Sequence, residues 1–410
     1  MPSGVRDTAR ENKDGLPLAG LRVLEFCHTI MGPSAGMLLA DLGAEVIKVE
    51  SSPQGDSTRR LRGFASGFFY AFNRNKRSLA IDLKSGAGRA LIHRLIGSTD
   101  IVLENFGPGT MDRLGCGYGD FAALNPRLVY CALKGFLSGP YEHRPALDEV
   151  VQFMAGLAYM TGPPGQPLRA GASVIDIMGG MFAVIAIQAA LREREQTGRG
   201  QLVKSALFES TAFLMTQHMA GEAVTGRPPP PMPTREGAWG IYETFKTAGE
   251  EMIFVGLTSD NHWRRFCEHF GRNDLLENPL YATNQDRVRE RPMIRTIVAE
   301  ILSGQTLAAL TELFDRIGIP FAPVAKPGDL FDDPQLNARG RMLGIEFPNG
   351  VRARMPRLPI EIGDHDLGLR RQAPGVGEHT VEILREAGLS EAEIADLHGR
   401  GIVSWPEEAA

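Results

Sequence analysis

A strand–helix–strand repeat near the start of the chain constrains the fold more than any other feature. An apolar strand is expected over residues 21–27 (LRVLEFC), a helix over 35–42 and a second strand over 44–50 (AEVIKVE). Two parallel strands joined by a crossover helix form a βαβ unit. Further strands are expected at 78–83, 100–106 and 128–136. The sequence therefore predicts an α/β fold with a doubly wound parallel sheet, in which ligands bind beyond the carboxyl ends of the strands.

The loops at these strand ends carry Lys or Arg beside Gly or Asn, which suits a phosphate-bearing ligand. The cations in question are Arg59, Arg60, Lys76, Arg113 and Lys134. The alternative for each of them is a solvated surface position. No Walker loop and no G-x-G-x-x-G fingerprint follows the first strand, which argues against an ATPase and a standard dinucleotide enzyme. The net charge of −5 without a basic block argues against nucleic acid as a partner.

Asp176 is the only charged residue between Arg169 and Arg192. It stands where an extended segment, 171–175, turns into an apolar run, 177–191. As a helix this run is apolar on nearly every face, so it is expected to be buried all round. Asp176 is then either the N-cap of the helix or a reactive carboxylate at its mouth. The residues of this stretch alone favour the cap, because helix caps far outnumber nucleophiles.

The length of 410 residues predicts two domains, and a proline run, Arg227–Pro233, marks a boundary. We expect the first part of a large domain at 1–225, a linker at 226–238, a small α+β domain at 239–325, and a return linker with the end of the large domain at 326–410. A hairpin is predicted over 240–257. Residues 146–160 are predicted to form a helix in the core, and Ser390 to cap a helix over 391–398.

The cysteines and histidines predict neither a disulfide framework nor a metal site. The four cysteines are widely spaced, and the nine histidines are scattered without ligand spacing. Residues 1–16 do not resemble a secretory signal, and no uninterrupted apolar run reaches membrane-spanning length. We therefore expect a cytoplasmic protein with no membrane partner.

Six ordered motifs resemble those of the family III CoA-transferases, which include the formyl-CoA:oxalate and carnitine CoA-transferases. The motifs are LAGLRVLEF at 18–26, LGAEVIKVES at 42–51, GDSTR at 55–59, NRNKRS at 73–78, ENFGPG at 104–109 and TGRGQ at 197–201. The resemblance runs over nearly the whole chain. It implies an interlocked homodimer with a Rossmann-like large domain and a small domain, and coenzyme A as a cosubstrate with no tightly bound cofactor.

The resemblance also assigns site residues. Asp176 matches the catalytic aspartate of the family, which is compatible with a capping role. Positions that contact CoA in the family match Lys76, Asn105, Phe106, Arg113 and Lys134. A loop that lines the active site matches His28, Thr29, Ile30 and Met31. Two departures stand out: residues 255–260 carry one glycine where relatives have a glycine-rich lid, and Ser51 replaces an arginine that holds the nucleotide in one branch.

Three classes of function remain open at this point. The first is CoA transfer between carboxylic acids through an aspartyl anhydride and an aspartyl-CoA thioester. The second is 2-methylacyl-CoA racemisation, for which relatives carry Gly-His-Asp where this chain has Ala146-Leu147-Asp148. Because leucine cannot carry a proton, transfer is favoured. The third is a non-catalytic CoA-binding protein.

The overall pattern is most similar to branches that use succinyl-CoA with C4 or C5 dicarboxylates, such as itaconate, mesaconate, citramalate, malate or glutarate. A second carboxylate that is buried must be paired with a cation. The candidates are Arg59, Arg60 and Arg169, and the alternative is that these arginines form surface ion pairs.

Overall fold

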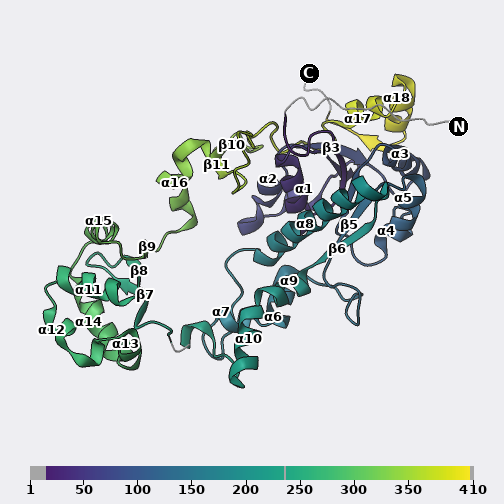
Figure 1. Cartoon of the computed structure of the whole chain (residues 1–410). Helices are drawn as coiled ribbons and strands as arrows, with labels where there is room; N and C mark the ends of the chain where they lie inside the picture. Colours follow the sequence, from purple (N-terminus) through teal and green to yellow (C-terminus); the bar gives the residue numbers. More distant parts are fainter. Residues whose placement is uncertain (1–14, 235–236, 407–410) are drawn as a thin grey trace. The chain divides into compact units, whose positions relative to one another are not determined.

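A computed structural model describes residues 15–234 and 237–406, and its contacts divide the chain into two compact units (Figure 1). The larger unit holds the residues up to Pro233 and those from Ala338 on. The smaller unit spans Thr234–Asn337. The chain therefore crosses into the small unit slightly before, and leaves it after, the predicted bounds of 239 and 325.

The large unit is built on a seven-stranded sheet with the strand order β12-β3-β2-β1-β4-β5-β6. Its strands are β1 (Arg22–Phe26), β2 (Glu45–Ser51), β3 (Lys76–Ile81), β4 (Ile101–Glu104), β5 (Val129–Lys134), β6 (Leu202–Ala206) and β12 (Val403–Ser404). All pairs are parallel except β12 with β3. Strands β1 to β6 thus have the Rossmann order, whose direction reverses between β1 and β4. The predicted α/β fold with a parallel sheet is confirmed.

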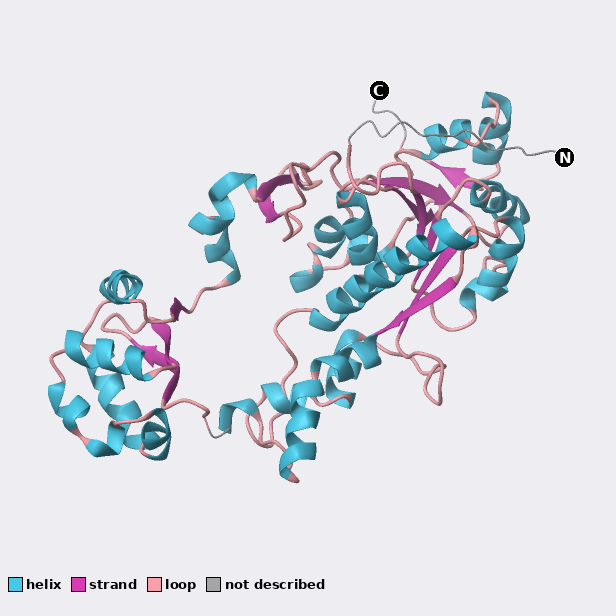
Figure 2. Ribbon diagram, viewed as in Figure 1, coloured by secondary structure: helices cyan, strands magenta, loops and turns pink. Residues whose placement is uncertain are grey.

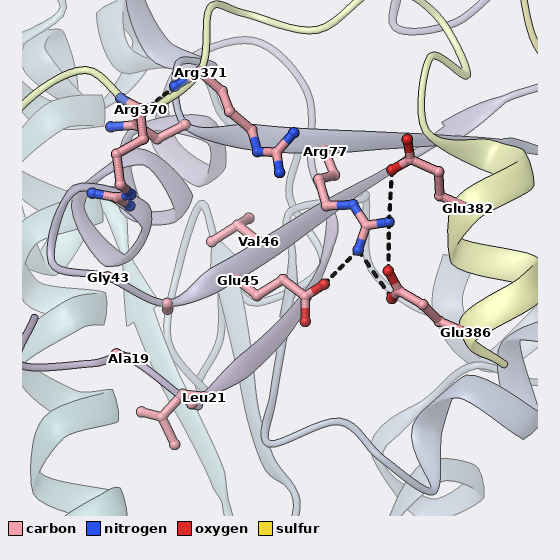
Figure 3. Close-up of a pocket in the computed structure, with 13 residues that line it drawn as sticks. Ala19, Leu21, Gly43, Glu45, Val46, Arg77, Arg370, Arg371, Glu382 and Glu386 are labelled. Atoms are coloured by element: carbon pink, nitrogen blue, oxygen red, sulfur yellow. Dashed lines mark hydrogen bonds and ion pairs between the residues drawn. The ribbon is translucent and has the colours of Figure 1, made fainter. Parts of the chain in front are cut away.

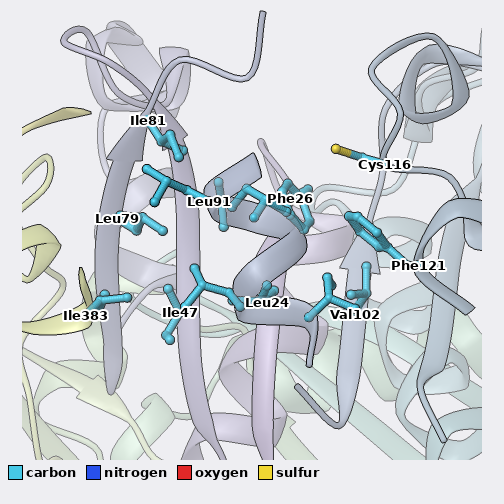
Figure 4. Close-up of a cluster of buried hydrophobic side chains, with 14 of the residues drawn as sticks. Leu24, Phe26, Ile47, Leu79, Ile81, Leu91, Val102, Cys116, Phe121 and Ile383 are labelled. Atoms are coloured by element: carbon cyan, nitrogen blue, oxygen red, sulfur yellow. The ribbon is translucent and has the colours of Figure 1, made fainter. Parts of the chain in front are cut away.

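Helices cover both faces of this sheet (Figure 2). Alternate side chains of β1 point to opposite faces, as expected for a strand. Leu24 and Phe26 join a cluster with side chains of α3 (Gly86–Ile96), α5 (Tyr118–Leu124) and α17 (Thr380–Glu386) (Figure 4). Val23 and Cys27 join a second cluster with α1 (Met31–Asp41) and α8 (Val174–Thr197). The sheet is therefore buried on both sides, which explains its continuous apolar strands.

Helix α1 begins at Met31, four residues before the predicted start, because Pro33 is accommodated in its first turn. It lies close against α8. A Cβ atom on Gly180 would come within 2.8 Å of the Met31 carbonyl oxygen, and one on Gly179 within 2.5 Å of the Met31 side chain. The two adjacent glycines therefore permit the close approach of α8 to the first turn of α1.

The prediction that α8 is buried on every face is wrong for the chain as described. Met181 and Ile185 are exposed, while Ala183 and Ile187 are buried. The helix also has the length and hydropathy of a membrane-spanning segment. It packs, however, against α1, β5 and β6 within the large unit.

Residues 146–160 form two short helices rather than one core helix. These are α6 (Asp148–Met154) and α7 (Leu157–Thr161), separated by Gly156 at φ +87°. Phe153, Met154 and Tyr159 are exposed. The prediction of a single core helix is therefore wrong, because a residue in the left-handed region ends α6.

The small unit combines a three-stranded antiparallel sheet with helices. Its strands are β7 (Ile241–Lys246), β8 (Met252–Leu257) and β9 (Phe321–Pro323), and its main helices are α11 (Asp260–His269), α12 (Asn273–Glu277), α13 (Asn284–Arg289), α14 (Arg291–Ser303) and α15 (Leu307–Ile317). The predicted hairpin over 240–257 is confirmed. The single glycine of residues 255–260, Gly256, lies inside β8.

The last part of the chain returns to the large unit. It forms a hairpin of β10 (Met342–Glu346) and β11 (Arg352–Pro356), then α17, α18 (Glu391–Gly399) and β12. Ser390 caps α18 as predicted, since its hydroxyl accepts a hydrogen bond from the Glu393 amide. The remaining helices of the large unit are α2 (Phe68–Phe72), α4 (Thr110–Arg113), α9 (Leu207–Leu214) and α10 (Thr216–Thr225), and α16 (Pro334–Asn337) ends the small unit.

A cavity of about 340 Å³ lies at the amino ends of β1, β2 and β3 (Figure 3). Arg77 of β3 projects between Glu45 of β2 and two residues of α17, Glu382 and Glu386. The Arg77 nitrogens lie 2.6 Å from Glu45, 3.3 Å from Glu382 and 2.9 Å from Glu386. Arg22 forms a further ion pair with Glu45 at 2.7 Å. These paired charges tie α17 to the amino edge of the sheet.

Candidate active site

A second cavity, also of about 340 Å³, lies at the opposite, carboxyl end of the sheet. It is next to the point between β1 and β4 where the strand order reverses, which is where ligands bind in such folds. Eight of the predicted site residues line it, namely His28, Thr29, Ile30, Met31, Asn105, Lys134, Arg169 and Asp176. Within the residues that the structure describes, no group of three His, Cys, Asp or Glu side chains is placed to hold a metal ion.

Asp176 lies in the first turn of α8, but it is not the cap of the helix. Helix α8 begins at Val174. The amides of Ile175 and Asp176 both donate to Oδ2 of Asp148, at 2.8 and 3.0 Å. Across 15–234 and 237–406, no hydrogen bond to the Asp176 carboxylate itself is formed. The capping role considered for Asp176 is therefore wrong, since a carboxylate from α6 takes that place.

The environment of Asp176 makes its carboxylate unusually basic. Burial raises the pKa of Asp176 to about 7, and the negative charge of Asp148 adds to the effect. A carboxyl group with a raised pKa in a cavity is typical of a reactive residue.

The loop after β1 is held by the loop after β4. The His28 amide donates to Oδ1 of Asn105 at 3.0 Å, and Nδ2 of Asn105 donates back to the His28 carbonyl at 2.8 Å. The His28 ring packs against Phe106, with ring centroids 5.7 Å apart. Burial lowers the pKa of His28, which favours the neutral imidazole. Asn105 and Phe106 thus position the loop that lines the cavity.

A buried network holds the same loop from the other side. Thr29 has φ +67°, a conformation that is unusual for a β-branched residue. Its amide donates to Oγ1 of Thr58 at 3.0 Å, and the Thr58 hydroxyl donates to Asp56 at 2.7 Å. Asp56 is paired at 2.9 Å with Lys48, which also donates to the Cys27 carbonyl. The sequence motifs contained Lys48, Asp56 and Thr58, but their shared role appears only when β1, β2 and the 55–59 segment meet.

Lys76 is in the interior, outside the cavity. Its side chain has no exposed surface, and its Nζ lies 2.7 Å from Glu25 and 2.9 Å from the Pro33 carbonyl and the Asn73 side chain. Burial lowers the pKa of Lys76 to about 8. Every contact of this ammonium group is with the protein, so a contact with CoA stays a prediction.

Three other predicted cations do not line the cavity. Arg59 forms an ion pair with Glu50 at 2.6 Å and lies 3.6 Å from the centre of the Phe69 ring. Arg60 is exposed and donates to the Gln54 carbonyl. Arg113 is exposed at the end of α4, where it donates to Thr110.

The two cations that do line the cavity are each paired with an acid. Lys134 lies 2.6 Å from Glu104 and donates to the Phe106 carbonyl at 2.8 Å. Arg169 forms an ion pair with Glu149, which also lines the cavity. Asp148 and Glu149 were not among the predicted site residues. No local pattern could have indicated Asp148, because its partners lie 27 and 28 positions away.

Comparison with known proteins identifies relatives along most of the chain. The family described as CoA-transferase family III matches residues 18–380. A succinate–glutarate CoA-transferase of Agrobacterium fabrum is 34% identical over 90% of this chain and 95% of the relative. The human succinyl-CoA:glutarate CoA-transferase is 30% identical over 95% of this chain and 91% of the relative. The crystal structure of a CAIB/BAIF family protein from Brucella suis matches with a TM-score of 0.82 and 34% identity, covering 91% of this chain and 99% of that one.

Proposed function

The chain belongs to CoA-transferase family III, and on that premise we propose that it transfers CoA from succinyl-CoA to a C4 or C5 dicarboxylate through Asp176. Family members use a CoA thioester as a cosubstrate. The observation that carries the proposal is the Asp176 carboxylate, which is basic, accepts no hydrogen bond from the described part of the chain, and lines a cavity at the carboxyl edge of the sheet.

The proposed chemistry requires only exchange between activated acyl groups. The ionised Asp176 attacks the thioester carbonyl, the carbon–sulfur bond breaks, and the electron pair leaves with CoA thiolate. The resulting mixed anhydride is attacked by the thiolate at the aspartyl carbonyl, which releases the donor acid and forms an aspartyl-CoA thioester. The acceptor carboxylate then reverses both steps, and no ATP is consumed. The amides of Ile30 and Met31, in the cavity lining after β1, are candidates for donors to the developing oxyanion.

We assign contact with CoA to residues of the cavity and its rim, namely His28, Thr29, Ile30, Met31, Asn105, Phe106, Arg113 and Lys134. Lys134 sits at the end of β5 with one-fifth of its side chain exposed, and Arg113 is exposed beyond β4. Both can reach a phosphate beside the carboxyl edge of the sheet. Lys76 supports the site from within, because its contacts fix Glu25 and the first turn of α1.

Arg169 is the cation best placed to bind the second carboxylate of a dicarboxylic acid. It lines the cavity, whereas Arg59 and Arg60 do not. Its partner in the structure is the carboxylate of Glu149, which a substrate carboxylate would displace. The names of the two relatives, both glutarate CoA-transferases with succinate or succinyl-CoA as the other partner, support a dicarboxylate.

We further propose that the protein is a cytoplasmic, interlocked homodimer. Exposed apolar side chains cluster on α8, α9 and α10, namely Met181, Ile185, Phe213, Leu214 and Met219. A soluble chain rarely leaves such an area uncovered. Light scattering should therefore give twice the mass of one chain, and Ile185→Arg should reduce it. A monomeric wild-type protein would contradict the proposal.

Racemisation remains the alternative, and Leu147 argues against it. This residue lines the cavity and is 70% exposed, but its side chain has no group that can accept or donate a proton. Incubation of a 2-methylacyl-CoA in heavy water should leave the α-hydrogen unexchanged. Rapid deuterium uptake would support the racemase instead.

The nucleophile is tested by trapping. Incubation with succinyl-CoA and hydroxylamine should convert Asp176 to a hydroxamate, detected by the mass of the peptide that contains it. Asp176→Ala should abolish both the label and CoA transfer. A fully active Asp176→Ala variant would rule out this chemistry.

The identity of the acceptor carboxylic acid is tested by a screen of acceptors. Succinyl-CoA is offered to glutarate, malate, citramalate, mesaconate and itaconate, and to monocarboxylates of equal length, and the products are identified by mass. We expect transfer to the dicarboxylates, with Arg169→Met removing the preference. Equal rates with glutarate and with valerate, the monocarboxylate of equal length, would show that no second carboxylate is recognised.

A further inference from the structure

We propose that Asp148 is a positioning residue for the transfer reaction, which holds the first turn of α8 so that the Asp176 carboxylate is left unpaired and facing the cavity. The inference rests on the proposed nucleophilic role of Asp176. In the sequence Asp148 matches only the Asp of the racemase Gly-His-Asp motif, which gives it no role in CoA transfer.

The hydrogen bonds at the start of α8 carry the argument. The first amides of a helix need acceptors, which the side chain of the N-cap residue usually provides. Ser173, the N-cap residue of α8, makes no such hydrogen bond. Asp148 accepts from the Ile175 and Asp176 amides instead, and only 7% of its surface is exposed. An acid in the first turn can bind these amides itself, so Asp148 prevents Asp176 from doing so.

Gln152 fixes the orientation of Asp148. It lies one turn further along α6 and is fully buried. Its Nε2 donates to Oδ1 of Asp148, and its Oε1 accepts from the Ala170 amide at 2.8 Å. Asp148 and Gln152 together therefore hold the segment from Arg169 to the first turn of α8 against α6.

The charges around the cavity determine how Asp148 acts on Asp176. Helix α6 contributes Asp148 and Glu149, the loop after β1 contributes His28, β5 contributes Lys134, and the segment before α8 contributes Arg169. Lys134 and Arg169 are already paired with Glu104 and Glu149, and burial favours the neutral form of His28. Asp148 is the charged side chain that holds the backbone of Asp176, and its charge repels the Asp176 carboxylate.

This repulsion favours the covalent intermediates. When Asp176 attacks the thioester, its negative charge leaves with the CoA thiolate, and the aspartyl anhydride is neutral at that position. The aspartyl-CoA thioester is neutral there as well. The like-charge repulsion between Asp148 and Asp176 is therefore relieved on acylation, which raises the reactivity of the free enzyme without a contact to the substrate.

The test is the pH profile of hydroxamate formation in Asp148→Asn. Asparagine keeps an oxygen acceptor for the α8 amides and removes the charge. We expect the acid limb of the profile to move down by about one pH unit. At pH 8 the rate should fall about 3- to 10-fold because the nucleophile is less basic, while KM for succinyl-CoA stays within about twofold. An unshifted acid limb at the wild-type rate would overturn the proposal.

Two measurements separate this proposal from a loss of folding and from failure of the proposed function. Ser390→Ala removes the cap of α18, far from the cavity, and should lower stability while leaving the acid limb in place. Infrared titration of the Asp176 carboxyl band, identified by its absence in Asp176→Asn, gives the pKa without turnover. If wild type forms no hydroxamate, the proposed function fails. The infrared titration then still decides the effect of Asp148, and an unchanged pKa in Asp148→Asn would count against it.

Discussion

Two cavities of the large unit have the same volume and lie at opposite ends of one sheet, but their charges are arranged differently. At the amino end, Arg77 is surrounded by Glu45, Glu382 and Glu386, so opposite charges meet. At the carboxyl end, the Asp148 carboxylate accepts from the Asp176 amide and its charge raises the pKa of the Asp176 carboxyl, so like charges lie close together. The volume of a cavity therefore says little about its chemistry.

The difference indicates that the carboxyl-end cavity, and not the amino-end one, holds a reactive group. Ion pairs that are largely buried offset the cost of desolvating each charge, and they hold segments together without leaving a reactive group. A buried carboxylate beside another carboxylate is held at higher free energy, which a covalent reaction can release. Substitutions at the two cavities should therefore have different effects on activity and stability.

The largest effect is expected for Asp176→Asn. CoA transfer should fall by about 10³-fold or more, because the amide cannot form the acyl-enzyme. The rate of CoA transfer from succinyl-CoA to glutarate, measured at saturating succinyl-CoA, checks this. Activity within tenfold of wild type would show that Asp176 is not the nucleophile.

The same variant should be more stable than wild type at high pH. The pKa of Asp176 is raised to about 7 in the folded chain and is ordinary when unfolded. The folded state therefore binds more protons between these values, and the free energy of unfolding of wild type falls as pH rises from about 4 to about 7. Asp176→Asn should gain about 1–3 kcal/mol at pH 8 and little at pH 3.5, measured by urea unfolding. An equal gain at both pH values would mean that the charge is not its cause.

Breaking the amino-end network should cost stability rather than activity. Arg77→Met removes a buried arginine whose partners Glu45 and Glu386 are partly exposed and keep Arg22, so we expect a loss of about 1–2 kcal/mol in the free energy of unfolding. KM for succinyl-CoA should not change. Arg385→Met, which breaks an exposed pair with Glu391, is the matched control and should cost less than about 1 kcal/mol. A large change in KM for Arg77→Met would indicate that the two cavities are coupled.

The cations at the carboxyl end should affect binding of the cosubstrate. Arg113→Met removes an exposed charge, and the expected rise in KM for succinyl-CoA corresponds to about 1 kcal/mol with unchanged stability. Lys134→Met should raise KM by a similar or larger amount, about 1–3 kcal/mol, and also destabilise the chain because Glu104 loses its partner. Unchanged KM in both variants would show that these cations do not bind CoA.

The smallest effect is expected at Thr29. Its positive φ strains a β-branched residue, so Thr29→Gly should relieve about 1 kcal/mol of strain, partly offset by greater freedom of the unfolded chain. A net change in stability below about 1 kcal/mol, together with lower activity, would show that the loop is held for function. A clear loss of stability would mean that the Thr29 side chain contributes more to packing than to strain.

The sequence by itself determined the class of fold and eight of the residues that line the carboxyl-end cavity. The spacing of apolar residues and the positions of glycine and proline are local properties of the sequence. The alternation of strands and helices that they indicate predicted the parallel sheet and placed ligand contacts at its carboxyl edge. The ordered motifs indicated the family and brought Asp176, Asn105 and the 28–31 loop to one place. The prediction of the sheet needed only local sequence patterns and the rules by which parallel strands align, whereas the site residues came from the resemblance to the family.

Only the tertiary structure decided which charges are available. Lys76, Arg59 and Asp176 have similar local surroundings in the sequence, each a charged residue near the end of a secondary-structure element. In the fold Lys76 is enclosed by Glu25, Pro33 and Asn73. Arg59 is paired with Glu50, and the cap expected of Asp176 comes from Asp148 on another helix. The partner of a charged side chain is set by contacts between segments far apart in the chain. Burial changes the free-energy cost of leaving that side chain unpaired. No local pattern could predict the partner or the cost.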